Sequence, residues 1–138
     1  MTYYIMTEEQ IVEYVNLRAS VRDAHMKVCE ELGYHSVSTR DSYATKWAFT
    51  DRMKVAHQPV TDHLNMMPIA IGKKKAEVIK SATIMAEQKG MTEAYIKNIG
   101  WSTEWGEYEV RQTWYIYKEN GKWFFKMGKD CKAKHEVA

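Results

Sequence analysis

Arginine, histidine and amide side chains occur at a few positions where the sequence is otherwise apolar. At about 100° per residue, Arg18 and His25 lie on one margin of a helix predicted over residues 7–32. Arginine can bind an anionic group, and histidine can exchange protons near neutral pH. Gln112 interrupts a predicted apolar strand face that also holds Trp114. We therefore predict a pocket for a small apolar or anionic ligand, lined by Arg18, His25, Gln112 and Trp114. In the alternative, each polar group has its own hydrogen bond in a packed core.

Two cysteine–histidine pairs, His25 with Cys29 and Cys131 with His135, have a spacing that puts both members on one helix face. Together they would offer a Cys2His2 zinc shell. Neither pair matches a Cys-x-x-Cys knuckle, so a metal is not favoured, and we predict no cofactor. Cys29 beside His25 also lacks an evident acid to orient a nucleophile–base pair. No motif identifies a reaction, and catalytic residues stay unassigned.

A β-hairpin is predicted by Asn120-Gly121, since these two residues tolerate the positive φ values of a two-residue turn. The turn sets the register, with Glu119 opposite Lys122 and Tyr117 opposite Phe124. Alternation along the strands then separates two faces. The face predicted to meet the core comprises Tyr108, Val110, Gln112, Trp114, Ile116, Trp123, Phe125 and Met127.

The opposite face of the hairpin mixes aromatic rings with charge. We predict a surface for a homodimer or a protein partner, because aromatic residues are enriched at interfaces. This partner surface consists of Arg111, Tyr115, Tyr117, Phe124 and Lys126. Base stacking and phosphate contacts are less favoured, since the aromatic motif of an RNA-recognition sheet is missing. In the alternative, the rings only pack across the strands beside water.

The remaining chain is predicted to be largely helical. Thr7 and Gln10 have the spacing of a capping box at the first helix, and Gly33 should end it. Further helices are predicted over residues 41–58, 60–67 and 73–89, with an extended structure over 44–49 as an alternative. A strand is predicted over 94–101. His57 and His63, which flank Pro59, are interpreted as surface residues.

The composition is that of an ordinary globular protein, with 138 residues, 45% hydrophobic and 28% charged. We predict a single α+β domain over residues 1–128 and a flexible basic tail over 129–138. The net charge is +2, with lysines concentrated in the second half, which could favour anions. Because no apolar run approaches about 20 residues, no membrane association is expected. The N-terminal residues lack a signal-peptide pattern and there are only two cysteines, so we expect a cytoplasmic protein.

Two stretches, IGKKKAEVIKSATIMAEQKG and AYIKNIGWSTEWGEYEVRQTWYIYKENGKWFF, carry a family resemblance over about residues 70–127. Their lysine-rich helix start and closing Asn-Gly-Lys-Trp turn resemble the ketosteroid-isomerase and nuclear-transport-factor-like superfamily, which has a cystatin-like cone. The resemblance implies a curved sheet wrapped around helices, an apolar pocket and dimerisation through the sheet. Isomerase members use an inward acidic base. The predicted inner face offers Gln112 and no carboxylate, so no catalytic residue is carried over.

Together these patterns predict an α+β fold, with a long N-terminal helix and further helices packed on a C-terminal antiparallel meander. The predicted function is a non-enzymatic binding module that acts through a sheet-mediated homodimer or partner surface, with a small ligand pocket. One alternative is a small isomerase- or dehydratase-like enzyme with its pocket near His25. Another is a winged-helix-type nucleic-acid binder that uses residues 73–89 as its contacting helix.

Overall fold

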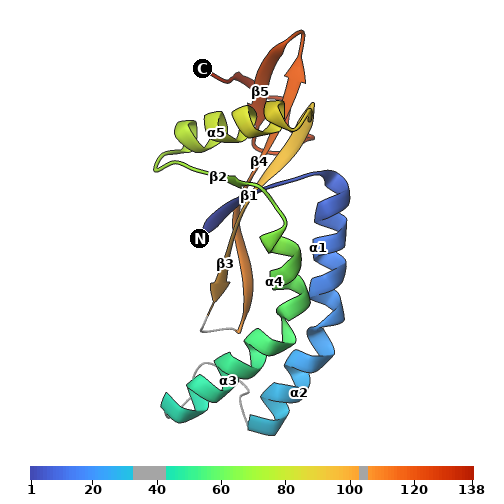
Figure 1. Cartoon of the computed structure of the whole chain (residues 1–138), viewed down its shortest axis with the longest axis vertical. Coiled ribbons are helices and arrows are strands. Elements are labelled where there is room, and N and C mark those ends of the chain that lie inside the picture. The colour runs from blue at the N-terminus through green and yellow to red at the C-terminus, as the bar shows by residue number, and fades with distance from the viewer. Residues whose placement is uncertain (33–42, 103–105) are drawn as a thin grey trace. The chain divides into compact units, whose positions relative to one another are not determined.

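The computed structural model describes residues 1–32, 43–102 and 106–138. The chain divides into two compact units (Figure 1). Unit 1 comprises Met1–Ile11, Met67–Gly100 and Val110–Ala138, and unit 2 comprises Val12–Met66 and Trp101–Glu109. The predicted single domain over residues 1–128 stays a prediction.

The fold class is α+β, as predicted, with an open antiparallel sheet. The helices are α1 (Glu8–Ser20), α2 (Arg22–Leu32), α3 (Tyr43–Ala56), α4 (Gln58–Asn65) and α5 (Lys75–Gln88). The strands are β1 (Thr2–Met6), β2 (Ile69–Ala70), β3 (Glu93–Ser102), β4 (Glu107–Glu119), β5 (Lys122–Lys126) and β6 (His135–Glu136). They form a six-stranded sheet in the order β2-β1-β3-β4-β5-β6. Among the described residues, no helix combines the length and the apolar character that a bilayer crossing requires.

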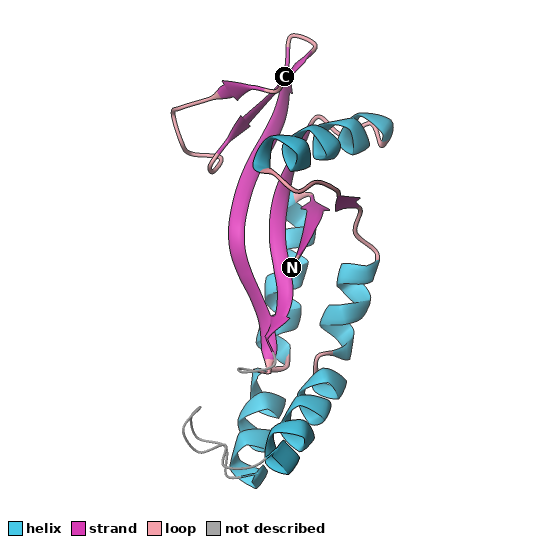
Figure 2. Ribbon diagram, turned by 90° about the vertical axis from the view of Figure 1, so that its left-hand side faces the viewer, coloured by secondary structure: helices cyan, strands magenta, loops and turns pink. Residues whose placement is uncertain are grey.

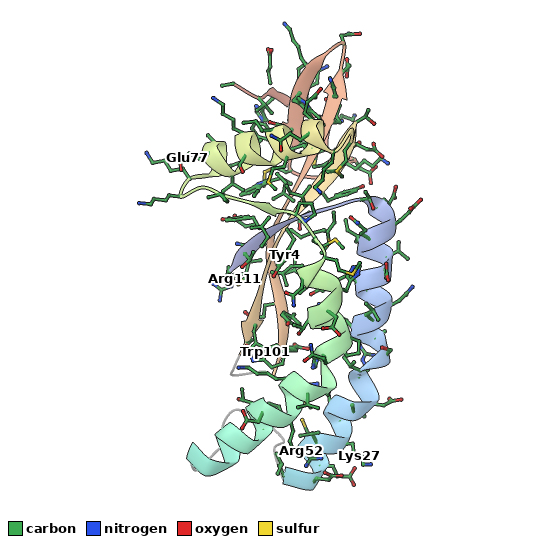
Figure 3. The ribbon with its side chains drawn as sticks, viewed as in Figure 1. Tyr4, Lys27, Arg52, Glu77, Trp101 and Arg111 are labelled. Carbon is green, nitrogen blue, oxygen red and sulfur yellow. The ribbon has the colours of Figure 1, made fainter. Side chains whose placement is uncertain are left out.

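In unit 1, α5 packs across one face of the sheet (Figures 1 and 2). Its buried side chains recur at helical spacing, which gives the helix one apolar face. The core of this unit consists of Ile5, Ala70, Val78, Ile79, Ala82, Ala86, Ala94, Ile96, Trp114 and Ile116. Glu77, at the start of α5 (Figure 3), accepts hydrogen bonds from the backbone N–H groups of Lys73 and Lys74 at 2.8 and 3.3 Å. This carboxylate satisfies groups that a helix start leaves unpaired.

The predicted hairpin is confirmed in its turn and its register. Asn120 and Gly121 have φ values of 52° and 79°. Glu119 pairs with Lys122, Tyr117 with Phe124, and Ile116 with Phe125. The turn chemistry therefore determined the pairing of β4 and β5.

The sheet also contains two strands, β1 and β2, that the sequence patterns did not predict. β1 pairs with β3, with Ile5 opposite Ile96, and with β2, with Tyr3 opposite Ala70. The short aromatic run of β1 was a weak signal, because a strand of this length depends on its neighbours. β1 leads directly into the confirmed capping box. There the Thr7 N–H donates to Gln10 Oε1 at 2.9 Å, and the Gln10 N–H donates to Thr7 Oγ1 at 3.2 Å.

The N-terminal helix, predicted as continuous, is divided at Val21 into α1 and α2. Ser20 Oγ donates to the Leu17 carbonyl at 2.7 Å, and the Val21 N–H donates to the Arg18 carbonyl at 3.3 Å. Serine side chains that bond back to the preceding turn compete with helical hydrogen bonding. α2 ends at Leu32. Gly33, the predicted end of the helix, lies outside the described residues.

In unit 2, α2 and α3 lie side by side (Figure 1) and bury Val28, Phe49 and Met53. An ion pair of 2.5 Å joins Arg52 to Glu31 beside this core. α3 confirms the predicted helix over 41–58 and excludes the extended alternative. α4 confirms the helix predicted over 60–67, although it begins two residues earlier. His57 and His63 are buried, which corrects their interpretation as surface residues.

Part of the predicted C-terminal tail is paired in the sheet. In β6, His135 lies opposite Phe125 and Glu136 lies opposite Phe124. The Val137 N–H also donates to the Trp123 carbonyl at 2.9 Å. Flexibility of residues 129–138 stays a prediction, but the backbone of their last part follows β5.

Candidate functional site

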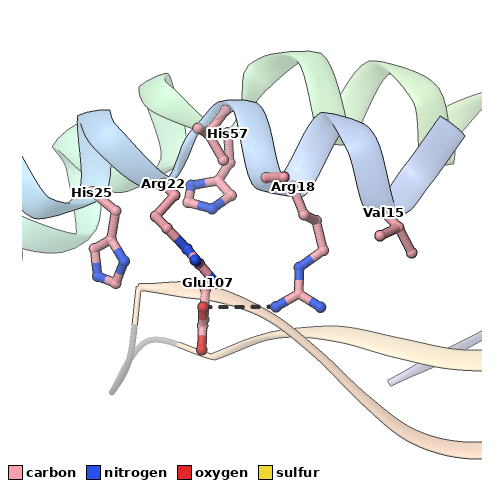
Figure 4. A pocket seen from close by; sticks show the side chains of 8 residues that line it. Val15, Arg18, Arg22, His25, His57 and Glu107 are labelled. Carbon is pink, nitrogen blue, oxygen red and sulfur yellow. Dashed lines mark ion pairs between the residues drawn. The ribbon is translucent and has the colours of Figure 1, made fainter. Parts of the chain in front are cut away.

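A cavity of about 300 Å³ lies within unit 2 (Figure 4). Residues spaced three or four apart on α1 and α2 form one wall, because this spacing places side chains on one helix face. The lining residues are Val15, Arg18, Ala19, Val21, Arg22, His25, His57 and Glu107. His57 joins α3 to α4, and Glu107 begins β4. Helical spacing thus brings the arginines together with His25, whereas the tertiary fold adds His57 and Glu107.

The lining has more fixed positive than fixed negative charge. Arg18 Nη2 lies 3.6 Å from Glu107 Oε2 (Figure 4), and the Arg18 guanidinium lies 5.7 Å from the centre of the Tyr14 ring. Arg22, one turn further along, is exposed and has no hydrogen-bond or ion-pair partner among the described residues. Two guanidinium groups therefore face one carboxylate, which favours an anion in this cavity.

His57 presents a neutral ring to the cavity. Its side chain is 3% exposed, and Nδ1 lies 2.9 Å from the Met53 carbonyl oxygen. Since a carbonyl only accepts, Nδ1 carries the hydrogen and Nε2 keeps a lone pair in the neutral ring. Burial lowers the pKa of His57, and the charges of His25 and Arg18 lower it further, against the hydrogen bond to Met53 and the charge of Glu107. His57 is thus an uncharged acceptor beside two cationic groups.

The ring of His57 is held in place by aromatic neighbours from the same unit. It meets Trp101 and Tyr108 edge-on, at centroid distances of 5.4 and 6.2 Å. The Tyr108 hydroxyl is hydrogen-bonded to the Thr61 hydroxyl. Trp101 Nε1 and the Tyr14 hydroxyl are buried without a hydrogen-bond partner among the described residues. Burial raises the pKa of Tyr14 to about 12, so this hydroxyl stays protonated.

We expect His57 to make unfolding easier as the pH falls below the ordinary histidine pKa of about 6.5. In this range the unfolded chain binds a proton at residue 57 before the folded chain does. The free energy of unfolding therefore decreases with falling pH until the lowered folded-state pKa is reached. Urea denaturation between about pH 5 and 8 measures the slope. The slope should be smaller in His57→Gln than in the unaltered protein. An unchanged slope in His57→Gln would contradict the expectation.

The residues predicted to share a pocket are divided between the two units. Arg18 and His25 line the cavity of unit 2. Gln112 is exposed on β4, and Trp114 belongs to the core of unit 1, stacked on Tyr3 at 5.7 Å. Neither Gln112 nor Trp114 lines the cavity. Along β4 the buried stretch begins at Trp114. The prediction from alternation that Gln112 faces the core was therefore wrong.

Sequence reasoning missed three of the polar groups in the cavity. Arg22 follows Arg18 by four residues, so helical spacing was a usable signal for it. His57 and Glu107 have no local signal, because they approach α1 and α2 only through tertiary packing.

The outer face of the sheet in unit 1 is the face opposite α5, and most of the predicted partner surface lies on it. The rings of Tyr115 and Tyr117 are stacked at 5.6 Å, and those of Tyr117 and Phe124 at 5.7 Å. Lys126 Nζ lies 5.3 Å from the centre of the Tyr117 ring. Arg111 is separated from Tyr115 and Tyr117 by an even number of residues along β4, so it lies on the same face of the strand. The structure therefore places the aromatic members of the predicted surface in one continuous row.

One member of this row is covered. Tyr115 is only 6% exposed, and its hydroxyl donates to Glu93 Oε2 at 2.5 Å. Burial and this hydrogen bond raise the pKa of Tyr115. Lys129 Nζ lies 5.9 Å from the centre of this ring. The accessible rings of the face are therefore the half-buried ones, Tyr95, Tyr117 and Phe124.

The cysteine–histidine pairs do not form a metal centre with other described residues. Among the residues that the structure describes, no group of three or more His, Cys, Asp or Glu side chains is placed to hold a metal ion. Cys29 and Cys131 are both free thiols. Burial raises the pKa of Cys29, which keeps its thiol protonated.

No family model, no curated protein and no solved structure matches this chain. The resemblance to the ketosteroid-isomerase and nuclear-transport-factor-like superfamily stays a prediction.

Proposed function

We propose that the protein is a non-enzymatic binding module that holds a small anionic ligand in the cavity of unit 2. The observation that carries the proposal is the pair of guanidinium groups, Arg18 and Arg22, against the single carboxylate of Glu107. A carboxylate or phosphate on the ligand would balance this charge. Arginine binds both groups through two parallel hydrogen bonds.

The rest of the lining favours an apolar body on the same ligand. Val15, Ala19 and Val21 contribute apolar surface beside the arginines. The neutral His57 offers one hydrogen-bond acceptor without a further charge. A volume of about 300 Å³ is at the lower end of the range for ligand pockets. An aromatic carboxylate with one ring is therefore a suitable probe.

Benzoate tests the proposal directly. We expect it to shift the ring-proton resonances of His25 and His57, and benzamide, which has the same shape without charge, to leave them unchanged. Arg22→Ala should raise the Kd for benzoate about ten-fold or more, because it removes a hydrogen-bond donor to a charged group. Arg22 has no partner among the described residues, so its removal should leave the fold intact.

Arg52→Ala is the matched control. Arg52 is an exposed arginine of unit 2 that pairs with Glu31 and does not line the cavity. The Arg52→Ala substitution should leave the Kd for benzoate unchanged. Loss of binding in both arginine variants, or no shift of either histidine at millimolar benzoate, would reject the cavity as an anion site.

A small isomerase- or dehydratase-like enzyme is the second candidate, and the tautomer of His57 favours it. With Nδ1–H donated to the Met53 carbonyl, Nε2 could accept a proton from a ligand held by Arg18. Deuterium transfer from D2O into a bound carboxylate with an acidic C–H would support this candidate. Binding without any exchange supports the non-enzymatic module.

A further inference from the structure

The outer face of the sheet in unit 1 combines aromatic rings with lysine ammonium groups. Four rings touch in a row across three strands, Tyr95 on β3, Tyr115 and Tyr117 on β4, and Phe124 on β5. A lysine lies over each ring, at distances of 5.0 to 5.9 Å from Nζ to the ring centre. These lysines are Lys97, Lys126, Lys129 and Lys134.

Acids beside the face offset part of this charge, and one of them is Glu93, which accepts the hydrogen bond from the Tyr115 hydroxyl and also lies near Lys129. Lys129 and Lys134 have long ion pairs of 3.7 Å, with Glu8 and Glu119. Lys126 has no ion-pair partner among the described residues, and Lys97 donates to the Thr113 hydroxyl at 3.3 Å. Unit 1 as a whole has 13 Lys and Arg against 8 Asp and Glu, a net charge of +5, whereas unit 2 has 7 against 10, a net charge of −3. The excess positive charge of the protein therefore belongs to the unit that has this face.

This charge argues against the predicted homodimer through the sheet. Two copies of the face would bring like charges together, which costs free energy at an interface. The face instead complements a polyanion. A row of half-buried rings with lysines above it also fits a polyanion whose flat groups can stack.

We propose that the outer face of the sheet binds single-stranded nucleic acid, with bases stacked on Tyr117 and Phe124 and phosphates bound by Lys126 and Lys134. Aromatic side chains stack on any base, and lysines that track the backbone give affinity without sequence preference. A duplex hides the faces of its bases, so it should bind more weakly. The surface is separate from the cavity of unit 2, and either site can exist without the other.

Fluorescence anisotropy with a labelled oligo(dT) of about 12 nucleotides tests the proposal. The observed affinity should fall between about 50 and 200 mM salt, and Lys126→Ala should reduce the slope of log K against log salt by about 0.7. Lys80→Ala, an exposed lysine of α5 on the opposite face, should leave the slope unchanged. Tyr117→Leu with Phe124→Leu should raise the Kd about ten-fold or more at constant salt.

The lysine variants keep the test decisive if the double leucine variant loses its fold, which circular dichroism would reveal. Absence of binding at about 50 mM salt would overturn the proposal. So would equal affinity for a blunt duplex, or equal weakening by Lys80→Ala and Lys126→Ala. Binding of poly-glutamate as tightly as the oligonucleotide would assign the face to acidic proteins instead. Arg22→Ala, the cavity variant, should bind the oligonucleotide normally.

Discussion

Gly106→Ala should lower the free energy of unfolding by about 3 kcal/mol, from left-handed backbone strain together with overpacking. Gly106 has a φ of +66°, which an alanine adopts only at a cost. An added Cβ would also lie 2.5 Å from Phe49 Cε1 and 2.7 Å from Met53 Cγ. Both neighbours are fully buried, so neither can move aside freely. Urea denaturation of the whole chain measures the change.

Gly121→Ala separates the two causes. Gly121 has a φ of +79°, but a Cβ there meets nothing within 4 Å. Gly121→Ala should therefore lower the free energy of unfolding by only about 1 kcal/mol, because it adds backbone strain alone. If both variants lowered the free energy of unfolding equally, the close approach of Gly106 to α3 would make no contribution to the loss of stability.

Ile116→Ala, a truncation on β4, should lower the free energy of unfolding by about 3 to 4 kcal/mol. Ile116 is fully buried in the core of unit 1, between the sheet and α5. Removing its outer carbons takes away apolar burial and leaves a cavity that the packed core fills only in part. Thermal or urea unfolding followed by circular dichroism measures this effect.

Val110→Ala is the matched control on the same strand. Val110 and Ile116 are six residues apart on β4 and therefore share a strand face, so the sequence predicted that both face the core. In the structure Val110 is 39% exposed. Val110→Ala should lower the free energy of unfolding by at most about 1 kcal/mol, mainly because alanine has a lower strand propensity than valine. A loss equal to that of Ile116→Ala would mean that Val110 is buried in solution.

The sequence alone determined the features that depend on near neighbours. Asn120-Gly121 specified the turn, and the turn specified the register of β4 and β5, because a two-residue loop allows one pairing. Thr7 and Gln10 specified the start of α1 through two reciprocal hydrogen bonds. Helical spacing also indicated that Arg18 and His25 share a side, and both line the cavity.

Tertiary structure decided the features that depend on residues far apart in the chain. Alternation assigned Gln112 and Ile116 to one face, but only packing against α5 determined which of them is buried. β1 and β6 joined the sheet because short strands gain their hydrogen bonds from partners elsewhere in the chain. His57 and Glu107 reached the arginines in the same way, since no local pattern records which side chains will meet across a folded unit. The excess positive charge of the cavity therefore became visible only when these distant groups were placed together.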